Sequence, residues 1–520
     1  MYNFFLKVLF PLKKAERYHL IIILLLTIIV AIFELLGIGL IIPILNMFIG
    51  NEFEKYTEYF NFFDKKSKES IFIIFLILLG LIYFLKFFIS GYLIYKQNDF
   101  SHKLNTDISR ALFKKYLYKK YIFHLNKHSS ELIRNTQSEV NIFTFGVVFQ
   151  LVRFFSEILI FLSICIILFL YAFKASMVTI FLFSFVGYFL LTFTNHRLKK
   201  WGHTRQFHSS LVLKQLQQAF ASTKEIIINN LEDIFVKKYH YHILENARAG
   251  RNKDTITQLP RLILELIGII SFIILIIFLM KTGNDIKEIF IIVGVFFFAA
   301  TKLLPSVSKI VQSIQSIKFN SPAVDIVYNE LIDLDKNTNR NEKTNKDNKL
   351  NFENIIFEKV NFRYMPNNKK ILDNVNINIK KNEKIGIIGK TGSGKSTFIN
   401  LLCGLLDASE GKIKINDNEI NDIIAPWQKM IGYVPQTVSV IDESILFNIS
   451  LESNEDKINM KKINEILKLV DLHDYIYSLP DKIYSLAGEN GSNISGGQAQ
   501  RLGIARALYR NPSIIILDEA

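Results

Sequence analysis

Residues 384–397 read KIGIIGKTGSGKST, and this stretch decides the fold of the C-terminal part of the chain. The apolar run 384–388 predicts a strand, a glycine-rich loop follows it, and a helix is expected to open at Phe398. Glycines let backbone N–H groups converge on a phosphate, while Lys395 can neutralise the outer phosphates and Ser396 can reach Mg²⁺. The pattern predicts an α/β domain of the P-loop NTPase type that binds ATP and Mg²⁺. The binding residues expected from it are Gly389, Thr391, Gly392, Ser393, Gly394, Lys395, Ser396 and Thr397.

A second short apolar run closes the sequence. Residues 514–517, IIIL, predict a buried strand that delivers Asp518 and Glu519 to its C-terminal edge, as in a Walker B strand. An acidic residue at this place can hold the Mg²⁺ shell, and its neighbour can polarise an attacking water. An apolar run with two acids could end any strand, but beside the phosphate loop it predicts a hydrolytic site with Asp518 on the metal and Glu519 and Lys395 as catalytic groups.

The composition divides the chain into two parts of different character. Of the 520 residues 50% are apolar, and these are concentrated in long blocks before about residue 310. Residues 335–349, DKNTNRNEKTNKDNK, are almost entirely polar and predict a linker. We therefore expect a transmembrane domain over 1–325, a linker over 326–349 and an ATP-binding domain over 350–520. The formal charge of +15 is spread over helical connections, which argues against a nucleic-acid partner.

Six apolar stretches are long enough to cross a membrane, since about 20 helical residues span a hydrocarbon core of roughly 30 Å. They lie near residues 19–48, 71–96, 141–172, 176–196, 256–281 and 287–310. The long connections 97–140 and 197–255 are rich in Lys and Arg, so the positive-inside rule places them, the N-terminus and the ATP-binding domain in the cytoplasm. Residues 53–64 alternate aromatics with acids and predict either a short external amphipathic helix or an ordinary loop.

Ionisable residues occur within the predicted spans, where charge is costly. Counted from the helix ends, Lys86, Arg261 and Lys302 fall at similar depth. They could line one cavity that holds an anionic head group, or each could extend its head to the interface, and spacing favours neither. For the acids within the spans we expect pairing with cations before substrate contact. These acids are Glu34, Glu157 and Glu265.

Between the two nucleotide motifs, residues 493–498 read NISGGQ and resemble the signature of ATP-binding-cassette ATPases, with Ile494 where leucine is usual. In that family the serine and glycines contact ATP held by the opposite subunit, which implies such a role for Ser495, Gly496, Gly497 and Gln498. Tyr364 resembles the aromatic that stacks on adenine. Gln436 resembles the glutamine that joins Mg²⁺ and the attacking water to the transport domain, and the coupling loops are expected near 118–130 and 220–235.

The whole pattern resembles exporters in which six spans are fused to one cassette and two such halves work together. The family's aspartate loop and γ-phosphate-sensing histidine would follow the catalytic glutamate. Both are absent from the sequence, so we expect a C-terminally truncated fragment that binds and hydrolyses ATP poorly. A membrane subunit without catalytic activity that regulates another protein is the alternative from a different class.

Among such exporters the membrane half most resembles the flippases of lipid-linked oligosaccharides in bacterial protein glycosylation. The likeness includes residues 33–34 with Pro43, residues 156–157, residues 259–261 with Glu265, and Lys302 with Pro305. It implies an anionic lipid-linked saccharide as substrate, an identical partner half and a place in the bacterial inner membrane among its lipids. Lysines stand at 86 and 302 where arginines are typical, and they lack the bidentate fork. Peptide or toxin, lipid A and drug exporters share the architecture.

Overall fold

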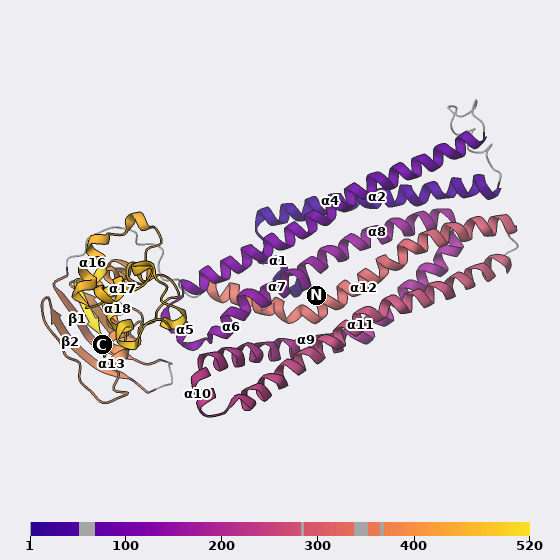
Figure 1. Ribbon diagram of the computed structural model, residues 1–520. Helices are drawn as coiled ribbons and strands as arrows, with labels where there is room; N and C mark the ends of the chain where they lie inside the picture. Colours follow the sequence, from indigo (N-terminus) through magenta and orange to yellow (C-terminus); the bar gives the residue numbers. More distant parts are fainter. Residues whose placement is uncertain (1, 51–67, 282–284, 337–351, 365–368, 520) are drawn as a thin grey trace. The chain divides into compact units, whose positions relative to one another are not determined.

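The computed structural model describes residues 2–50, 68–281, 285–336, 352–364 and 369–519. The chain forms two compact units (Figure 1). Unit 1 comprises Met1–Tyr118 and Lys127–Asn337, and unit 2 comprises Lys119–Asn126 and Thr338–Ala520. The eight residues Lys119–Asn126 thus belong to unit 2, although the segments before and after them belong to unit 1.

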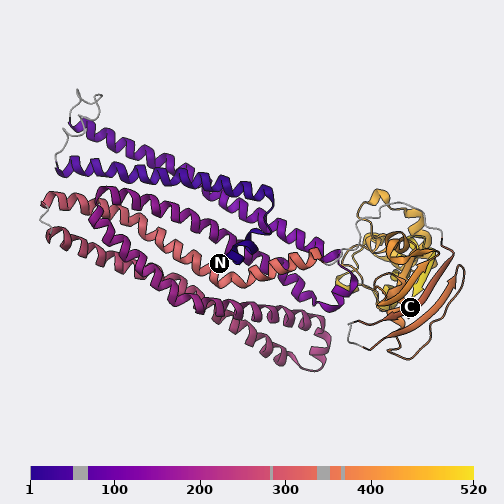
Figure 2. The ribbon, with the colours of Figure 1, turned by 180° about the vertical axis from the view of Figure 1, so that it is seen from behind.

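Unit 1 is built from long helices. In chain order they are α1 (Tyr2–Leu9), α2 (Lys14–Gly50), α4 (Lys68–Leu117), α6 (Ser129–Arg134), α7 (Val140–Phe143), α8 (Phe149–Tyr171), α9 (Phe173–Ala221), α10 (Thr223–Ile228), α11 (Glu232–Lys281) and α12 (Ile286–Lys336). Two single π-helical turns, Asn135–Glu139 and Thr144–Val148, interrupt the entry to α8. Figures 1 and 2 show α9 and α11 side by side, joined at their α10 ends.

Five helical stretches among the described residues are long and apolar enough to cross a membrane. They are Lys14–Ile49, Glu69–Leu117, Ser129–Tyr171, Glu232–Lys281 and Ile286–Ile332. Each contains one of the predicted spans. The remaining predicted span, near 176–196, lies in α9, where several side chains are outside the described set. Large apolar side chains are exposed along these helices, as expected of surfaces that face lipid. The chain is therefore a multi-pass membrane protein.

The basic connections predicted as loops are mostly helical. The helices α4, α9 and α11 extend well beyond their apolar parts, because neither long connection contains a proline that would stop them. The coupling loops expected near 118–130 and 220–235 contain the short helices α5 (Tyr121–Asn126) and α10. The helix α12 continues to Lys336, so residues 326–336 of the expected linker are helical. The external helix expected at 53–64 lies outside the described residues.

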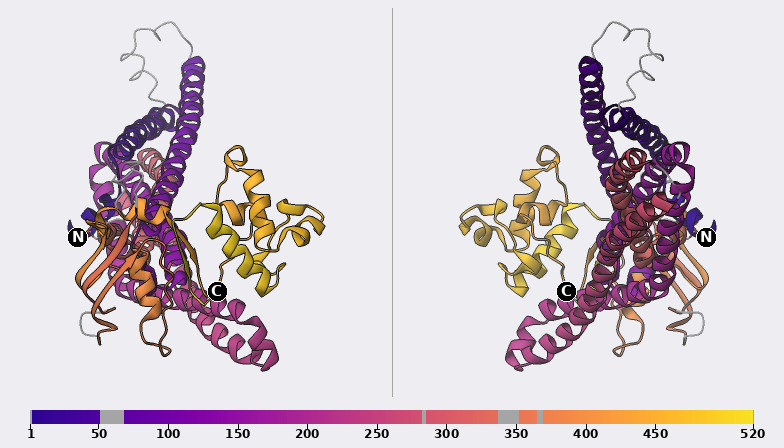
Figure 3. Two further views of the ribbon diagram at one scale, coloured as in Figure 1. Left: turned by 90° about the vertical axis from the view of Figure 1, so that its left-hand side faces the viewer. Right: turned by 90° about the vertical axis from the view of Figure 1, so that its right-hand side faces the viewer.

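Unit 2 holds two sheets and a helical group. The strands β1 (Asn354–Phe362), β2 (Leu372–Lys380), β3 (Glu410–Ile415) and β4 (Asn418–Glu419) form an antiparallel sheet in the order β2-β1-β3-β4. The strands β5 (Ile431–Val434) and β6 (Ile514–Leu517) form a parallel pair. The helical group comprises α15 (Ile445–Ser450), α16 (Met460–Leu469), α17 (His473–Ser478) and α18 (Gly496–Tyr509). Figure 3 shows this group, in yellow, to one side of the orange sheet.

Two separate apolar cores stabilise unit 2. In the first, helix α13 (Lys395–Leu402) packs on the antiparallel sheet, and Phe398 stacks on Phe357 with ring centroids 4.6 Å apart. Trp427 of α14 (Ile424–Lys429) is fully buried, and its indole N–H donates to the Leu402 carbonyl at 2.8 Å. The second core lies within the helical group. Helix α5 belongs to this unit: Ile122 packs against the first core, and the Lys120 ammonium lies 2.7 Å from Asp407.

Candidate functional site

The glycine-rich loop turns sharply into α13. Gly392 and Gly394 have positive φ angles of 82° and 97°, a region that favours glycine over residues with a side chain. A Cβ atom on Gly389 would lie 2.7 Å from the Ser393 hydroxyl, so the loop can close this tightly only without that atom. The first N–H groups of α13 have no intrahelical acceptors, and they face the loop as a place for an anion.

Lys395 bends back over this loop. Its ammonium donates to the carbonyl oxygens of Gly389 and Lys390 at 2.7 and 3.2 Å. These contacts hold a positive charge at the centre of the loop, beside the free N–H groups of the helix. The lysine is thereby kept at the loop, where its charge can neutralise a phosphate once it leaves these carbonyls.

The parallel register of β5 and β6 brings their polar ends together. Val434 pairs with Leu517, and the Asp518 N–H donates to the Val434 carbonyl at 3.0 Å. The residues that follow both strands therefore share one edge, where the Gln436 amide donates to the Glu519 carboxylate at 2.5 Å. The predicted strand at 514–517 is confirmed and both acids follow it, but its expected burial is not, because Ile515 and Leu517 are 51% and 55% exposed.

Tyr433 is positioned by the neighbouring acid. Its hydroxyl donates to Asp518 at 3.4 Å. Burial, and next the negative charge of Asp518, raise the pKa of Tyr433 to about 12, so the phenol stays a hydrogen-bond donor at neutral pH. Sequence reasoning missed this residue, although its place three positions before Gln436 was the available signal.

The phosphate loop and the two acids line one cavity of about 540 Å³. Its lining includes Gly389, Ser393 and Lys395 of the loop and Asp518 and Glu519 after β6. The strand predicted at 384–388, part of which lines this cavity, is not formed. A strand exists only through its neighbour, and among the described residues this segment pairs with neither sheet. Its Ile388 side chain is 98% exposed.

The other residues expected to bind nucleotide lie at two places. The Tyr364 hydroxyl is 3.1 Å from the Thr397 hydroxyl, and its ring meets Phe362 edge to face, so this aromatic lies beside α13. Ser495 caps α18 in a reciprocal arrangement: its hydroxyl accepts from the Gln498 N–H, while the Gln498 side chain accepts from the Ser495 N–H at 2.7 Å. The residues 495–498 do not line the cavity of the phosphate loop.

In unit 1, two of the three intramembrane cations converge. The ammonium groups of Lys86 and Lys302 lie 5.2 and 5.5 Å from the ring centroid of Tyr83. Lys86 also forms an ion pair with the buried Glu34. Tyr83 was missed from sequence, where only its position one helical turn before Lys86 could have indicated it. Its hydroxyl is buried and has no partner among the described residues.

The third cation, Arg261, does not share the contacts of Lys86 and Lys302. Arg261 pairs with Glu265 at 2.9 Å along the surface of α11, and its side chain is 74% exposed. No contact among the described residues joins it to Lys86 or Lys302. The prediction that the intramembrane acids pair with cations is confirmed, because Glu157 also pairs with Lys309 at 2.7 Å.

Comparisons with known proteins match both units. A family model described as ABC transporter transmembrane region matches residues 20–299, and one described as ABC transporter matches residues 372–520. The alpha-hemolysin translocation ATP-binding protein of Escherichia coli O6:H1 is 39% identical over 168 residues, 32% of this chain and 24% of that protein. The lacticin-481/lactococcin-DR transport/processing ATP-binding protein of Lactococcus lactis is 38% identical over 210 residues, 40% and 29% of the two chains.

An ATP-dependent lipid A-core flippase of Ralstonia nicotianae is 35% identical over 168 residues, 32% of this chain and 28% of that protein. The matched part of the chain thus spans between 24% and 29% of the length of these three relatives. With the two family models, the helices of unit 1 and the loop of unit 2 confirm the predicted fold class, a helical membrane domain joined to a P-loop cassette.

Proposed function

Because the chain belongs to the ABC transporters, we propose that it is one half of an ATP-driven exporter that moves an anionic lipid-linked saccharide across the bacterial inner membrane. The observation that carries this proposal is the convergence of Lys86 and Lys302 on Tyr83 within the apolar spans. A cation in lipid is costly unless it meets an anion, and a diphosphate between lipid and sugar would provide one. The second half would be an identical copy.

Unit 2 supplies groups for nucleotide hydrolysis. ATP would lie in the cavity with its phosphates on the N–H groups of the loop, and Lys395 would move from the loop carbonyls to the outer phosphates. Glu519 would orient a water and take its proton at a carboxylate oxygen, and the Gln436 amide fixes that carboxylate. The serine and glycines at 495–497 would contact the ATP of the partner half.

Mg²⁺ would find oxygen donors after β5 and β6 and in the first turn of α13. Hard cations prefer oxygen ligands, and the Asp518 carboxylate, the Ser396 hydroxyl and the Gln436 amide oxygen are of this kind. When bound, the ion would neutralise charge on the phosphates. Asp518 is held in place for this task by its backbone bond to β5 and by the phenol of Tyr433.

The intramembrane lysines differ in what they can offer a substrate. Lys86 shares its charge with Glu34, whereas Lys302 contacts only aromatic rings in its described interactions. Lys302 is therefore the better anion ligand. Arg261 would have to leave Glu265 before it reached the same head group, so we assign it a weaker role.

A second candidate substrate is a lipid A type glycolipid. The flippase from Ralstonia nicotianae is named for such a lipid, and phosphate groups on its sugars would meet the same lysines. Peptide export remains the alternative suggested by the names of the other relatives.

The test is ATP hydrolysis by the full-length protein in proteoliposomes, with and without lipid-pyrophosphate-linked oligosaccharide. We expect the substrate to stimulate wild type severalfold, Lys302→Ala to remove the stimulation while basal turnover persists, and Arg261→Ala to weaken it less. Lys281→Ala, at an exposed end of α11, is the control.

Two results would contradict parts of the proposal separately. Stimulation by lipid A alone would replace the substrate class and leave the transport function intact. Turnover that is unchanged in Lys395→Ala would exclude unit 2 as the source of hydrolysis, because that variant removes the only lysine lining the cavity among the described residues.

A further inference from the structure

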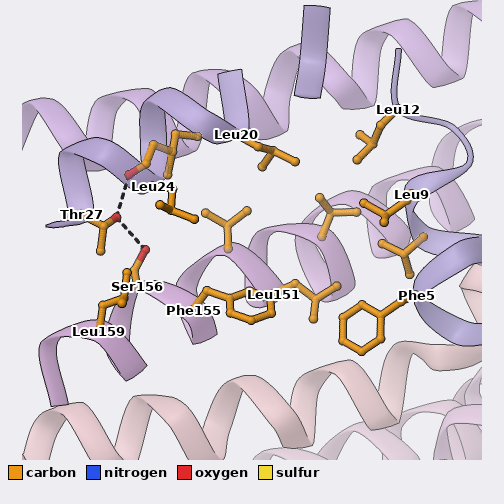
Figure 4. A pocket seen from close by; sticks show the side chains of 14 residues that line it. Phe5, Leu9, Leu12, Leu20, Leu24, Thr27, Leu151, Phe155, Ser156 and Leu159 are labelled. Atoms are coloured by element: carbon orange, nitrogen blue, oxygen red, sulfur yellow. Dashed lines mark hydrogen bonds between the residues drawn. The ribbon is translucent and has the colours of Figure 1, made fainter. Parts of the chain in front are cut away.

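A second pocket lies in unit 1, at the foot of the first span. It encloses about 210 Å³ between α1, the first turns of α2, and α8 with the π-helical turn before it. Figure 4 shows Leu20, Leu24 and Thr27 of α2 facing Leu151 and Phe155 of α8 across this space. Its length from Leu20 to Thr27 is seven helical residues, or about 10 Å.

The lining is apolar apart from two hydroxyls, and both are satisfied. Thr27 donates to the Ile23 carbonyl at 2.8 Å and lies 3.2 Å from the Ser156 hydroxyl, at one end of the pocket (Figure 4). Ser156 also accepts from the Gln97 amide at 3.0 Å. A water or a polar ligand therefore finds no open partner on the described walls, and the pocket suits a hydrocarbon chain.

The pocket has a buried floor and an exposed rim. Val8, Ile23 and Val148 are almost fully buried, whereas Leu9 and Phe155 are close to half exposed. The opening therefore leads outward through apolar side chains. Because these residues flank a membrane span, the medium outside the opening is lipid.

Three exposed basic residues lie between residues of the pocket lining along the chain. Lys13, Lys14 and Arg17 are exposed, and they lie between two lining residues, Leu12 and Leu20. The one acid between them, Glu16, does not neutralise their charges at the surface. Glu16 is buried and accepts a hydrogen bond from the Lys13 backbone N–H at 2.6 Å.

We propose that this pocket binds one acyl chain of an anionic phospholipid, whose phosphate lies against Lys13, Lys14 and Arg17. Apolar contact alone would not select an occupant, because lipid tails are as apolar as the leucines that line the walls. Selection comes from the shape of the recess and from the exposed basic residues that lie between two of its lining residues, Leu12 and Leu20. Each Lys or Arg near an anionic head group strengthens binding about fivefold.

The site differs from the substrate site proposed above. Lys86 and Lys302 lie elsewhere in unit 1 and do not line this pocket. The lipid is a resident of the membrane that holds α1 against α2 and α8, and its binding requires neither ATP nor transport. The proposal therefore stands or falls independently of the transported substrate.

The experiment uses the chain in nanodiscs that contain a phospholipid with a photoactivatable diazirine in its acyl chain. Phosphatidylglycerol and phosphatidylcholine probes are compared, and labelled peptides are identified by mass spectrometry. We expect phosphatidylglycerol adducts to concentrate in residues 5–12 and 148–159. The variant with Lys13, Lys14 and Arg17 changed to Gln should lose at least tenfold of this labelling.

Matched variants separate the site from the general lipid coat. Changing Lys224, Lys237 and Lys238 to Gln removes the same charge outside the pocket and should leave labelling unchanged. Leu24→Trp places an indole on the rim and should reduce labelling, whereas Ile270→Trp, on an exposed face of α11, should not.

Three outcomes would overturn the proposal. Equal labelling by the phosphatidylglycerol and phosphatidylcholine probes would show that the pocket does not select an anionic head group. Adducts spread evenly over the exposed helices would show only surrounding lipid. Labelling that a lipid-linked saccharide displaces would identify the pocket as part of the transport path instead.

Discussion

The buried ion pair between Glu34 and Lys86 gives the sharpest prediction of stability. Their side chains are 3% and 17% exposed, so both charges lie largely out of water. Removing one partner of a buried pair leaves the other charge uncompensated and typically costs about 3–5 kcal/mol, whereas replacing both by uncharged groups is often nearly neutral. We expect Lys86→Met to destabilise unit 1 by about 3 kcal/mol. Glu34→Gln should cost less, about 1–2 kcal/mol, because the ring of Tyr83 remains beside Lys86.

The double variant should then lie within about 1 kcal/mol of wild type, which requires a coupling energy of at least about 3 kcal/mol. The measurement is the SDS concentration that unfolds the chain in mixed micelles, followed by helical circular dichroism. The exposed pair of Arg248 and Glu245, outside the predicted span 256–281 of α11, is the control, and a similar cycle there should give less than about 0.5 kcal/mol. Single changes at Glu34 and Lys86 that are small and additive would refute the reasoning.

Two further results are expected. Gly202→Ala places a methyl group 2.0 Å from the Phe319 carbonyl oxygen, so α9 and α12 must separate at a cost of about 1–3 kcal/mol. In the control Gly250→Ala, the new methyl group meets nothing within 4 Å, so this variant should be neutral or stabilising. Both are measured in the same SDS titration. Burial, with a smaller effect of Asp518, raises the pKa of the Cys403 thiol to about 12, so at pH 8 only about one molecule in 10⁴ carries the reactive thiolate. Maleimide should therefore label Cys403 only after denaturation, and rapid labelling of the folded chain would show that this thiol is accessible.

Local patterns predicted much of the nucleotide site. The glycines of the phosphate loop and the strand before Asp518 follow from residue type and order, because the first is set by backbone freedom and the second by apolar β-branched residues. The contact between Gln436 and Glu519 could not be predicted in the same way. It depends on β5 and β6 being neighbours in register, and their residues are about 80 positions apart.

Two of the incorrect or incomplete expectations have the same origin. Residues 384–388 have a strand-like sequence, but a strand also requires a partner, which the pattern of one segment cannot reveal. Lys86, Arg261 and Lys302 were placed at one depth by counting along helices. Depth leaves open which way each helix face is turned, and the contacts of Arg261 are with its own helix.

The path of the chain through α5 has a mechanical consequence. This six-residue helix is packed into unit 2, yet both of its ends continue directly into unit 1, and the chain crosses once more near residue 337. Because Lys119–Asn126 is joined by peptide bonds to the segment with α4 on one side and to the segment with α6 on the other, a displacement of α5 is passed covalently to both helices.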